Sequence, residues 1–544
     1  MTTAELTRDY EIVVLPFDRN LEQFAPSYTP EEFTLEERYI AECFFTNLDK
    51  PVCVLKNLPQ EVKAALFSRY SRSVKNIRRL FLDEYVAPVL YPDWQADWGK
   101  KEEDETVEDL RVRQEEALDT RKAFVAFVDF LHTNGGLDKV VNVQRARKFF
   151  SKWLADFGDD SIAEEGTEQV AVEGISNIAT NVIQTKRVGI STIERSSRYV
   201  SFSEKRPDGE FLYDIPGEIK GTPLEEDYVA AMDLLFGTYA ELEEPYLNYI
   251  KALYPRGDEE TRVSFNRSRS AKRYDDLRDL LPFATQTSFG IVGNGRAFED
   301  LINRMLDHPI GEVRWWGQAI CQELNQVVPS FVERPQTRRG AEVQTYRKNI
   351  EVVRREIAGE VIKEETQEAR PSVWARLVDS TPGADGEVLS AFIFSGTKNI
   401  PLSLVRDRVN QLTSEERTEM LGRILVERAM NDPNKERAGV RFRKVPRAWE
   451  NAHYLFELWG RGGDFRDLHR HRQDTEERQL FTVENGFDLE KEVLSSPFTE
   501  KIMFALDGAA EVFRKLSRVS PDVAQYAVPY GAIQHWYKRM SARQ

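Results

Sequence analysis

The order of matching segments along this chain constrains its fold more than any other feature, because a chain that repeats itself is built from copies of one domain. An alternating apolar run at Val170 and Val172 has a counterpart at Tyr454, Phe456 and Leu458. Side chains that alternate in this way predict a half-buried strand in each place. A segment with helical spacing of apolar residues follows each run.

Two further pairs of segments recur. The hexapeptide LRDLLP at residues 277–282 has a counterpart AQYAVP at residues 524–529, in the same order after the predicted strands. Near the start, the stretch from Ala41 also resembles the stretch from Ala391 in the placement of its aromatic residues and its proline. We therefore predict two diverged copies of one domain.

Length supports this division, because 544 residues exceed what one hydrophobic core usually organises. The first copy is expected to span residues 1–332, with an insertion at about 205–270. A charged linker helix and loop at 333–385 separates it from the second copy at 386–544. The first copy continues through a further helix beyond the point that corresponds to Gln544, so we expect the second copy to be truncated at its C-terminus.

Composition excludes several functional classes. Asp and Glu outnumber Lys and Arg by 91 to 75, and this acidic balance argues against general binding of nucleic acid. No apolar run is long enough for a membrane helix, and the N-terminus lacks a signal pattern. Three cysteines without a paired motif indicate neither a disulfide framework nor a zinc site, and a cytoplasmic location fits best.

The densest basic cluster is Arg470-His471-Arg472, which His469 precedes. Two guanidinium groups beside an imidazole can bind phosphate oxygens and an electron-rich ring, as a nucleotide and flavin site requires. The alternative is a solvated helix end whose cations favour the C-terminal dipole. The cluster by itself leaves both interpretations open.

A second polar cluster runs from Glu194 to Tyr199 with the sequence ERSSRY. Two hydroxyl groups beside an arginine form a good phosphate site, and a carboxylate can accept hydrogen bonds from a ribose. Ordinary capping at a helix start would also explain these residue types.

Together the clusters resemble the signature RHRxxSxNExSxRY of the flavin-dependent thymidylate synthase family. The first copy keeps the second part of the signature but has Lys186-Arg187-Val188 in the Arg-His-Arg place and Ile193 in the Asn place. The second copy keeps Arg-His-Arg, has Thr475 in the Ser place and loses the rest. The matching residues of the first copy are Ser191, Glu194, Ser196, Arg198 and Tyr199.

The resemblance extends beyond the signature. GDDSIAEE matches the family's flavin segment at Ser161 and Glu164, although Asp159 replaces a histidine. Downstream, Arg278 belongs to the family's Arg-x-x-Leu-Pro element, and Asn294 and Arg296 form its Asn-x-Arg element. The family's activating arginine would fall at Met305, with Arg304 one residue away.

The resemblance implies an α+β fold, with a small mixed or antiparallel sheet packed with helices in each copy. It also implies a tetramer of single domains whose sites lie between subunits, so a fused chain is expected to form a homodimer that mimics this tetramer. Each copy then needs to keep only its own contribution to a shared site. The expected dUMP-binding residues are Glu194, Ser196, Arg198, Arg278 and Arg470.

The implied reaction is methylation of dUMP to dTMP with FAD, NADPH and methylenetetrahydrofolate. Arg470 and His471 are the expected catalytic residues, and no metal is expected. A different pyrimidine-modifying flavoenzyme, or a non-catalytic nucleotide-binding descendant, are the alternatives. The expected FAD-binding residues are Ser161, Glu164, Asn294, Arg296, Arg470, His471 and Arg472.

Overall fold

The computed structural model describes residues 21–91, 107–141, 143–152, 154, 160–362, 374–430 and 443–544. Asp159, which belongs to the expected flavin segment, lies outside the described residues, as do residues 363–373 of the expected linker. The chain forms two compact units. The first unit contains Met1–Glu365 and Leu489–Tyr530, and the second contains Thr366–Asp488 and Gly531–Gln544.

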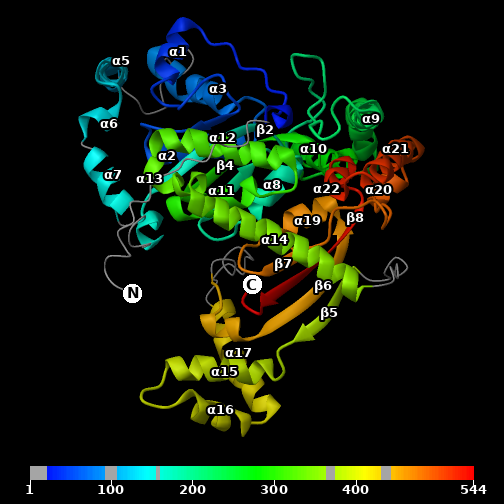
Figure 1. Cartoon of the computed structure of the whole chain (residues 1–544). Helices are drawn as coiled ribbons and strands as arrows, with labels where there is room; N and C mark the ends of the chain where they lie inside the picture. Colours follow the sequence, from blue (N-terminus) through cyan, green and yellow to red (C-terminus); the bar gives the residue numbers. More distant parts are fainter. Residues whose placement is uncertain are drawn as a thin grey trace. The chain divides into compact units, whose positions relative to one another are not determined.

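The first unit is built on a four-stranded antiparallel sheet with the order β1-β2-β4-β3 (Figure 1). The predicted strand at Val170 and Val172 is confirmed as β2, but its central residues are buried on both faces instead of alternating. Helix α2 lies against one face, and helices α8, α11 and α12 lie against the other. The strands are β1 (Val52–Val54), β2 (Thr167–Ser176), β3 (Ile190–Glu194) and β4 (Gln286–Asn294).

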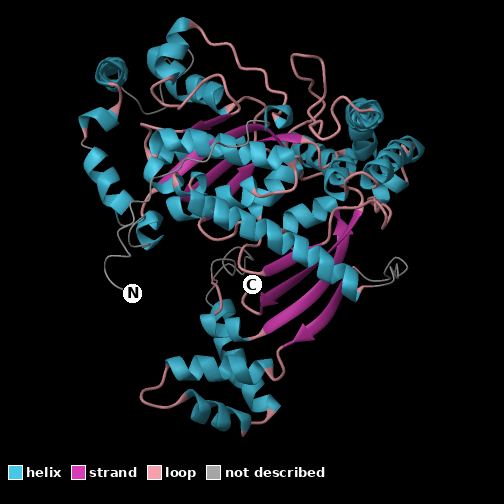
Figure 2. Cartoon of the chain, in the orientation of Figure 1, coloured by secondary structure: helices cyan, strands magenta, loops and turns pink. Residues whose placement is uncertain are grey.

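Helices make up most of the rest of the first unit (Figure 2). They are α1 (Leu35–Ala41), α2 (Gln60–Tyr70), α3 (Ile77–Phe81), α4 (Ala87–Leu90), α5 (Val107–Asn134), α6 (Leu137–Val140), α7 (Val143–Ser151), α8 (Asn177–Gln184), α9 (Pro223–Leu253), α10 (Arg262–Leu277), α11 (Gly295–Leu306), α12 (Gly311–Val327), α13 (Pro329–Val332), α14 (Arg338–Val361), α20 (Lys491–Leu494), α21 (Thr499–Ser517) and α22 (Pro521–Ala524). Among them, α5 and α14 are long and polar, with few buried side chains. In the described residues, no helix has both the length and the apolar composition needed to cross a bilayer.

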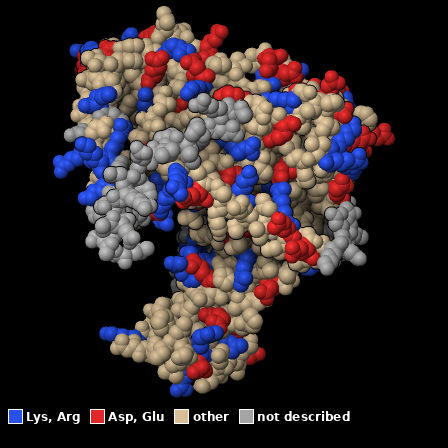
Figure 3. Space-filling model, in the orientation of Figure 1, with Lys and Arg blue, Asp and Glu red and all other residues tan. Residues whose placement is uncertain are grey.

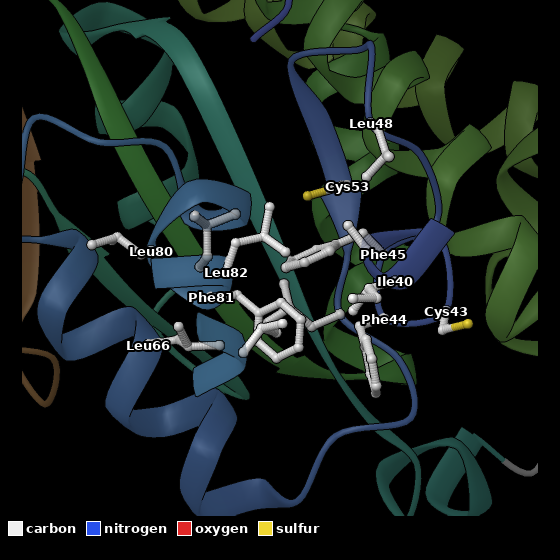
Figure 4. Packing of buried hydrophobic residues seen from close by; sticks show 14 of the residues in the cluster. Ile40, Cys43, Phe44, Phe45, Leu48, Cys53, Leu66, Leu80, Phe81 and Leu82 are labelled. Atoms are coloured by element: carbon white, nitrogen blue, oxygen red, sulfur yellow. The ribbon is translucent and has the colours of Figure 1, made fainter. Parts of the chain in front are cut away.

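Aromatic side chains dominate the core on the α2 face of the first sheet. Phe44, Phe45 and Phe81 pack together there, with ring centroids 5.0 and 5.6 Å apart for the two pairs that include Phe81. Figure 4 shows these rings between strand β1, which carries Cys53, and the helices that carry Leu66 and Leu80. Burial of this apolar surface fixes α2 and α3 on the sheet.

The second unit has its own four-stranded antiparallel sheet, with the order β5-β6-β8-β7. Two small apolar clusters, around Val388 and Leu389, join its helices to one another. The predicted strand at Tyr454, Phe456 and Leu458 is confirmed as β6. The elements are β5 (Ala375–Ser380), α15 (Ala384–Ser395), α16 (Leu402–Asn410), α17 (Ser414–Met430), β6 (His453–Arg461), α19 (Gly462–Leu468), β7 (Thr475–Arg478) and β8 (Ile533–Ser541).

The two sheets have the same topology, because in each the strands occur in the spatial order first, second, fourth, third. A helix follows the second strand in both, as the sequence predicts: α8 after β2, and α19 after β6. A 3-10 turn followed directly by Leu-Pro or Val-Pro precedes the fourth strand in both. Two units of sheet and helices therefore share one connectivity.

The sequence match between the stretches from Ala41 and Ala391 is wrong in its register. Strand β1 pairs with β2 as β5 pairs with β6, so the counterpart of β1 is β5 and not the helix α16. The segment from Ala391 corresponds instead to α2 and the start of α3. Both contain Lys-Asn-Ile, at residues 75–77 and 398–400. Aromatic placement alone led to the wrong match, because it does not specify strand pairing.

The structure also changes the expected boundaries. Strand β5 lies in the second sheet, although residues 333–385 were expected to be a linker and the second copy was expected to begin at 386. The charged part of that linker is helix α14. The extra length expected at 205–270 is mainly the long helix α9 and the helix α10, whereas the second half of the chain has α21 and the four-residue α22 at the corresponding positions.

The segment Leu489–Tyr530 is integrated into the first unit. Helix α21 packs along α9, and Phe283 donates its backbone N–H to the carbonyl of Val528 at 2.9 Å. Tyr530 donates in the same way to Leu281 at 2.9 Å, so the Leu-Pro and Val-Pro elements pair antiparallel with each other. The hydroxyl of Tyr526 also donates to the buried carboxylate of Glu312.

Candidate functional site

The loop of the first unit that corresponds to Arg-His-Arg is held by local contacts. It follows α8, and Lys186 pairs with Asp300 of α11 at 2.7 Å. Val188 is 79% exposed. At the three Arg-His-Arg positions this loop therefore has a lysine that is already paired, Arg187 and an exposed apolar side chain.

The second part of the signature lies at the end of β3. Glu194 is buried, and its Oε2 accepts a hydrogen bond from Gln184 Nε2 of α8 at 3.2 Å. Ser196 follows the strand, and its backbone N–H donates to the carbonyl of Ser71 at 3.0 Å. The backbone N–H of Arg198 in turn donates to Ser196 Oγ at 3.3 Å. Strand pairing therefore places these three predicted residues on one short turn.

Two of the predicted dUMP-binding arginines converge on one carboxylate. Arg198 Nε and Arg278 Nη2 each lie 3.2 Å from Asp275 Oδ1. Asp275 belongs to the last turn of α10, three residues before Arg278. Sequence reasoning missed Asp275, although a carboxylate at that helical spacing is a usual ion-pair partner. An anionic ligand at this position would compete with Asp275 for both guanidinium groups.

The expected flavin-binding residues of the first unit also make contacts with one another. Glu164 ends the 3-10 helix η5 (Asp160–Glu164), and its Oε1 lies 2.6 Å from Arg296 Nη1. Asn294 caps α11 by accepting from the N–H of Ala297 at 2.9 Å. Ser161 is exposed on the first turn of η5. The structure thus brings Glu164, Asn294 and Arg296 together around the start of α11.

The position of the activating arginine differs from the family pattern. Met305 is fully buried under α12, where its Cβ lies 2.7 Å from the place of a Cβ on Gly317. Arg304 points elsewhere, and its Nη1 donates to Thr185 Oγ1 at 2.8 Å. Arg304 therefore lies beside the loop of Lys186 to Val188 in the first unit.

In the second unit, Arg470, His471 and Arg472 form an exposed loop between α19 and β7. The sheet register aligns this loop with the first unit's loop. Gln286 begins β4 opposite Ser176, which caps α8, and Ile533 begins β8 opposite Arg461, which caps α19. Six residues further along each strand, Val292 pairs with Ser191, and Arg539 pairs with Thr475. Ser191 and Thr475 therefore occupy the same position in the two sheets, as the signature alignment predicts.

A basic pocket of about 500 Å³ lies next to this loop, within the second unit. Gln473, which follows Arg472 directly, and Thr475 form one wall. Its charged lining residues are Arg447, Glu450, His453, Arg539 and Arg543. Three arginines against one carboxylate make the pocket suitable for an anionic group.

One ion pair of this pocket repeats a pair of the first unit. Arg543 Nη1 lies 2.7 Å from Glu450 Oε1. Arg543 comes two residues after the end of β8, as Arg296 comes two residues after the end of β4, and Glu450 precedes β6 as Glu164 precedes β2. A hydrogen bond from Arg447, supported by Arg543, lowers the pKa of the Glu450 carboxyl despite some desolvation. Sequence reasoning assigned no role to Glu450 or Arg543, although the spacing of Arg543 after the Val-Pro element marks it.

The three cysteines do not have the environment of a nucleophile. All three are buried and have free thiols. Burial raises the pKa of the Cys43 thiol to about 11 and that of the Cys53 thiol to about 12. Because the thiolate is the reactive form, these thiols are poorly nucleophilic at neutral pH.

On the visible face, Lys and Arg side chains alternate with Asp and Glu side chains (Figure 3). The charge distribution on this face does not form a broad basic surface of the kind that binds nucleic acid.

Comparison with known proteins finds a matching family model and relatives that match over most of this chain. The family model for thymidylate synthase complementing proteins matches residues 99–330. A UPF0159 protein of Chlamydia pneumoniae is 31% identical over 515 residues, covering 94% of this chain and 87% of the relative. A UPF0159 protein of Chlamydia muridarum is 31% identical over 516 residues, with the same coverage.

Two further matches are more distant. A UPF0159 protein of Thermoplasma acidophilum is 27% identical over 416 residues, covering 72% of this chain and 78% of the relative. Among solved structures, the UMP/dUMP methylase PolB of Streptomyces cacaoi, bound with 5-Br dUMP, matches with 15% identity and a TM-score of 0.23. That match covers 32% of this chain and 75% of the methylase.

Proposed function

Because the chain belongs to the thymidylate synthase complementing protein family, we propose that it is a nucleotide methyltransferase that converts dUMP to dTMP. The observation that carries this proposal is the matching sheet register of the two half-signatures. Glu194 ends β3, Ser196 and Arg198 follow it, and Arg470 to Arg472 precede β7, which is the corresponding strand. The chain thus retains both parts of the family signature, one after β3 and the other before β7.

The same register supports an origin by duplication. The two sheets share strand order, connecting helices and the turn before the fourth strand. The ion pairs Glu164–Arg296 and Glu450–Arg543 occupy corresponding places. A duplicated gene relaxes selection on whichever half of each site is not used, and complementary loss of signature residues is the expected result.

We propose that the retained residues serve one kind of composite dUMP site. Arg198, Arg278 and Arg470 supply positive charge for the phosphate, and Ser196 donates a hydroxyl hydrogen bond to it. Glu194 accepts from a ribose hydroxyl. His471 acts with Arg470 on the pyrimidine ring, where fixed positive charge stabilises negative charge that develops during the reaction.

FAD is the proposed cofactor, and the residues of the second unit fit such a group. The basic pocket has room for a diphosphate, its arginines match the charge, and it adjoins the Arg470–Arg472 loop. His471 and Arg472 would contact the flavin, and Arg543 and Arg539 would hold its phosphates. In the first unit, Ser161, Glu164, Asn294 and Arg296 form the corresponding position. FAD reduced by NADPH would supply the reducing equivalents that complete methyl transfer from methylenetetrahydrofolate.

We further propose a homodimer, because the second unit exposes apolar side chains on two adjacent helices. Phe394 of α15 and Leu402 and Leu404 of α16 are each 44–45% exposed. On strand β5, Leu377 and Val378 are 53% and 55% exposed. Exposed apolar surface of this kind marks a protein interface.

The first experiment is a titration of the purified chain with FAD, followed by absorption of the flavin, with and without dUMP. We expect FAD to bind and dUMP to perturb the flavin spectrum. Formation of dTMP is then measured with methylenetetrahydrofolate and NADPH. Absence of flavin binding and of dTMP would refute the proposal.

A pair of matched substitutions tests whether the second unit alone supplies the functional residue at the histidine position of the signature. His471→Ala should abolish dTMP formation, because the second unit supplies the imidazole. Arg187→Ala changes the corresponding residue of the first unit and should leave the rate unchanged. Equal effects of the two substitutions would contradict the composite arrangement.

A further inference from the structure

Four ionisable side chains form a buried cluster at the base of the Arg470–Arg472 loop in the second unit. Lys538 Nζ lies 2.9 Å from Glu476 Oε2 and forms an ion pair with Asp474 Oδ2. His469 Nδ1 bonds to Glu476 Oε1. The side chains of all four residues are only 2–3% exposed.

The cluster holds the loop at both ends. Lys538 Nζ donates to the carbonyl of Leu468 at 2.9 Å, and His469 directly precedes Arg470. Asp474, two residues after Arg472, is bound by the same ammonium group. Because Lys538 lies in the middle of β8, one strand residue fixes the backbone before the loop and the side chain after it.

Paired charge favours the ionised form of the Glu476 carboxyl. Burial alone would raise the pKa of the Glu476 carboxyl, but the hydrogen bond and charge of His469, supported by Lys538, outweigh it, and this pKa is lowered. Removing one partner of a buried ion pair is strongly destabilising, because the remaining charge stays buried without compensation. Both ends of the Arg470–Arg472 loop are therefore attached to buried ion pairs, and breaking these pairs would be strongly destabilising.

The corresponding positions of the first unit carry no charge. Glu476 pairs across the strands with Lys538, and the corresponding cross-strand pair is Thr192 with Ile291. Ile190 takes the place of Asp474 and is 3% exposed, and Ile291 is fully buried. Thr185 takes the place of His469. The same sheet thus forms with neutral side chains at these positions.

The charged cluster is therefore not required to build this sheet, and it occurs in the half that retains Arg-His-Arg. Buried ion pairs contribute little net stability compared with apolar residues of similar size. We infer that His469, Asp474, Glu476 and Lys538 are positioning residues that hold the Arg470–Arg472 loop in the conformation that binds the flavin. The identity of the ligand rests on the proposed function, whereas the fixed loop conformation does not.

The test exchanges the cluster for the neutral set of the first unit. The variant combines His469→Thr, Asp474→Ile, Glu476→Thr and Lys538→Ile, so that no member of the cluster remains buried without its partners. We expect a cooperative thermal transition close to that of the parent chain. FAD affinity should fall at least about tenfold, and trypsin should cleave after Arg470 and Arg472 at least about tenfold faster, because the loop is no longer held.

A matched control changes an exposed cross-strand pair of the same two strands. Glu477 pairs with Tyr537 beside the cluster, and the double variant Glu477→Thr, Tyr537→Ile should leave both FAD affinity and cleavage unchanged. An exchange variant that binds FAD as tightly as the parent would overturn the inference. Loss of the cooperative transition would also overturn it, because the charges would then hold the sheet itself.

Failure of the proposed function gives a different result. If the parent chain does not bind FAD, the flavin proposal fails, and tryptic cleavage still decides whether the cluster fixes the loop. Unchanged cleavage in the exchange variant would then overturn the positioning role. Faster cleavage would retain that role for a loop whose ligand is not FAD.

Discussion

At the scale of single residues, the two nucleotide-binding arginines expected in the first unit share one carboxylate. Asp275 contacts both Arg198 and Arg278. The guanidinium groups are thus oriented in advance, but an incoming phosphate must replace or share this partner. Asp275 therefore sets a limit on the affinity of the site for anions.

We predict that Asp275→Asn tightens dUMP binding about fivefold, equivalent to about 1 kcal/mol, which is typical of a partly exposed ion pair. Isothermal titration of dUMP into the FAD-loaded chain would measure this. Glu259→Gln, an exposed change elsewhere in the first unit, is the control. Weaker binding in Asp275→Asn would mean that Asp275 orients the arginines more than it competes with the phosphate.

A neighbouring carboxyl makes stability dependent on pH. Desolvation raises the pKa of Asp276 to about 6, although hydrogen bonds from Lys272 and Tyr246 act against this shift. The folded state therefore binds this proton more tightly than the unfolded chain. Its stabilising effect is complete below the unfolded pKa of about 4 and is lost as the pH rises through about 6.

Asp276→Asn should therefore remove a fall in stability between about pH 4 and about pH 6. The free energy of unfolding in urea, measured across this range, tests the prediction. Asp258→Asn, at an exposed position, should keep the pH dependence of the parent chain. An unchanged slope in Asp276→Asn would show that this carboxyl titrates normally.

At the scale of elements, the junction between the loop of Lys186 to Val188 and strand β3 depends on a glycine. Gly189 has a φ of 77°, and a Cβ there would lie 2.7 Å from the Cβ of Ala297 in α11. Asn294 also donates its N–H to the Gly189 carbonyl at 3.3 Å. The close approach of this loop to α11 therefore requires the absence of a side chain.

Gly189→Ala is expected to destabilise the first unit by about 2–4 kcal/mol, through backbone strain and the clash with α11. Gly209→Ala isolates the strain, because Gly209 has a φ of 87° but nothing within 4 Å of its Cβ position. It should cost only about 1–2 kcal/mol. Chemical denaturation measures both, and equal costs would argue against the clash.

At the scale of the whole molecule, the second unit has a partly open sheet and exposed apolar helices. Strand β5 is exposed along nearly its whole length. Helices α15 and α16 carry exposed Phe394 and Leu404. A protein rarely leaves such side chains in water unless another surface covers them.

We predict that Phe394→Glu combined with Leu404→Glu dissociates the proposed homodimer, because charges at an apolar interface lose their hydration. Light scattering after size-exclusion chromatography gives the mass directly. Val519→Glu, at a 69% exposed position of the first unit, should not change it. A monomeric parent chain would contradict the dimer.

The spacing of residues within short segments was sufficient to predict some features of the fold and the site, but not others. The strands β2 and β6, the helices after them and the two half-signatures were predictable, because each depends on residue spacing within a short segment. The resemblance to the family rests on the same spacings. The match of Ala41 with Ala391 failed because β1 has only three residues and β5 is exposed along nearly its whole length, so neither strand can be identified without its pairing partner.

The amino-acid sequence by itself thus determined the family, the acidic balance and which signature residues each half retains. Only the tertiary structure decided which charges meet. Asp275 contacts Arg198 across 77 residues, Arg543 meets Glu450 across 93, and Lys538 meets Asp474 across 64. These contacts depend on strand register and on where loops return to the sheet. Side-chain spacing along one segment carries no information about either.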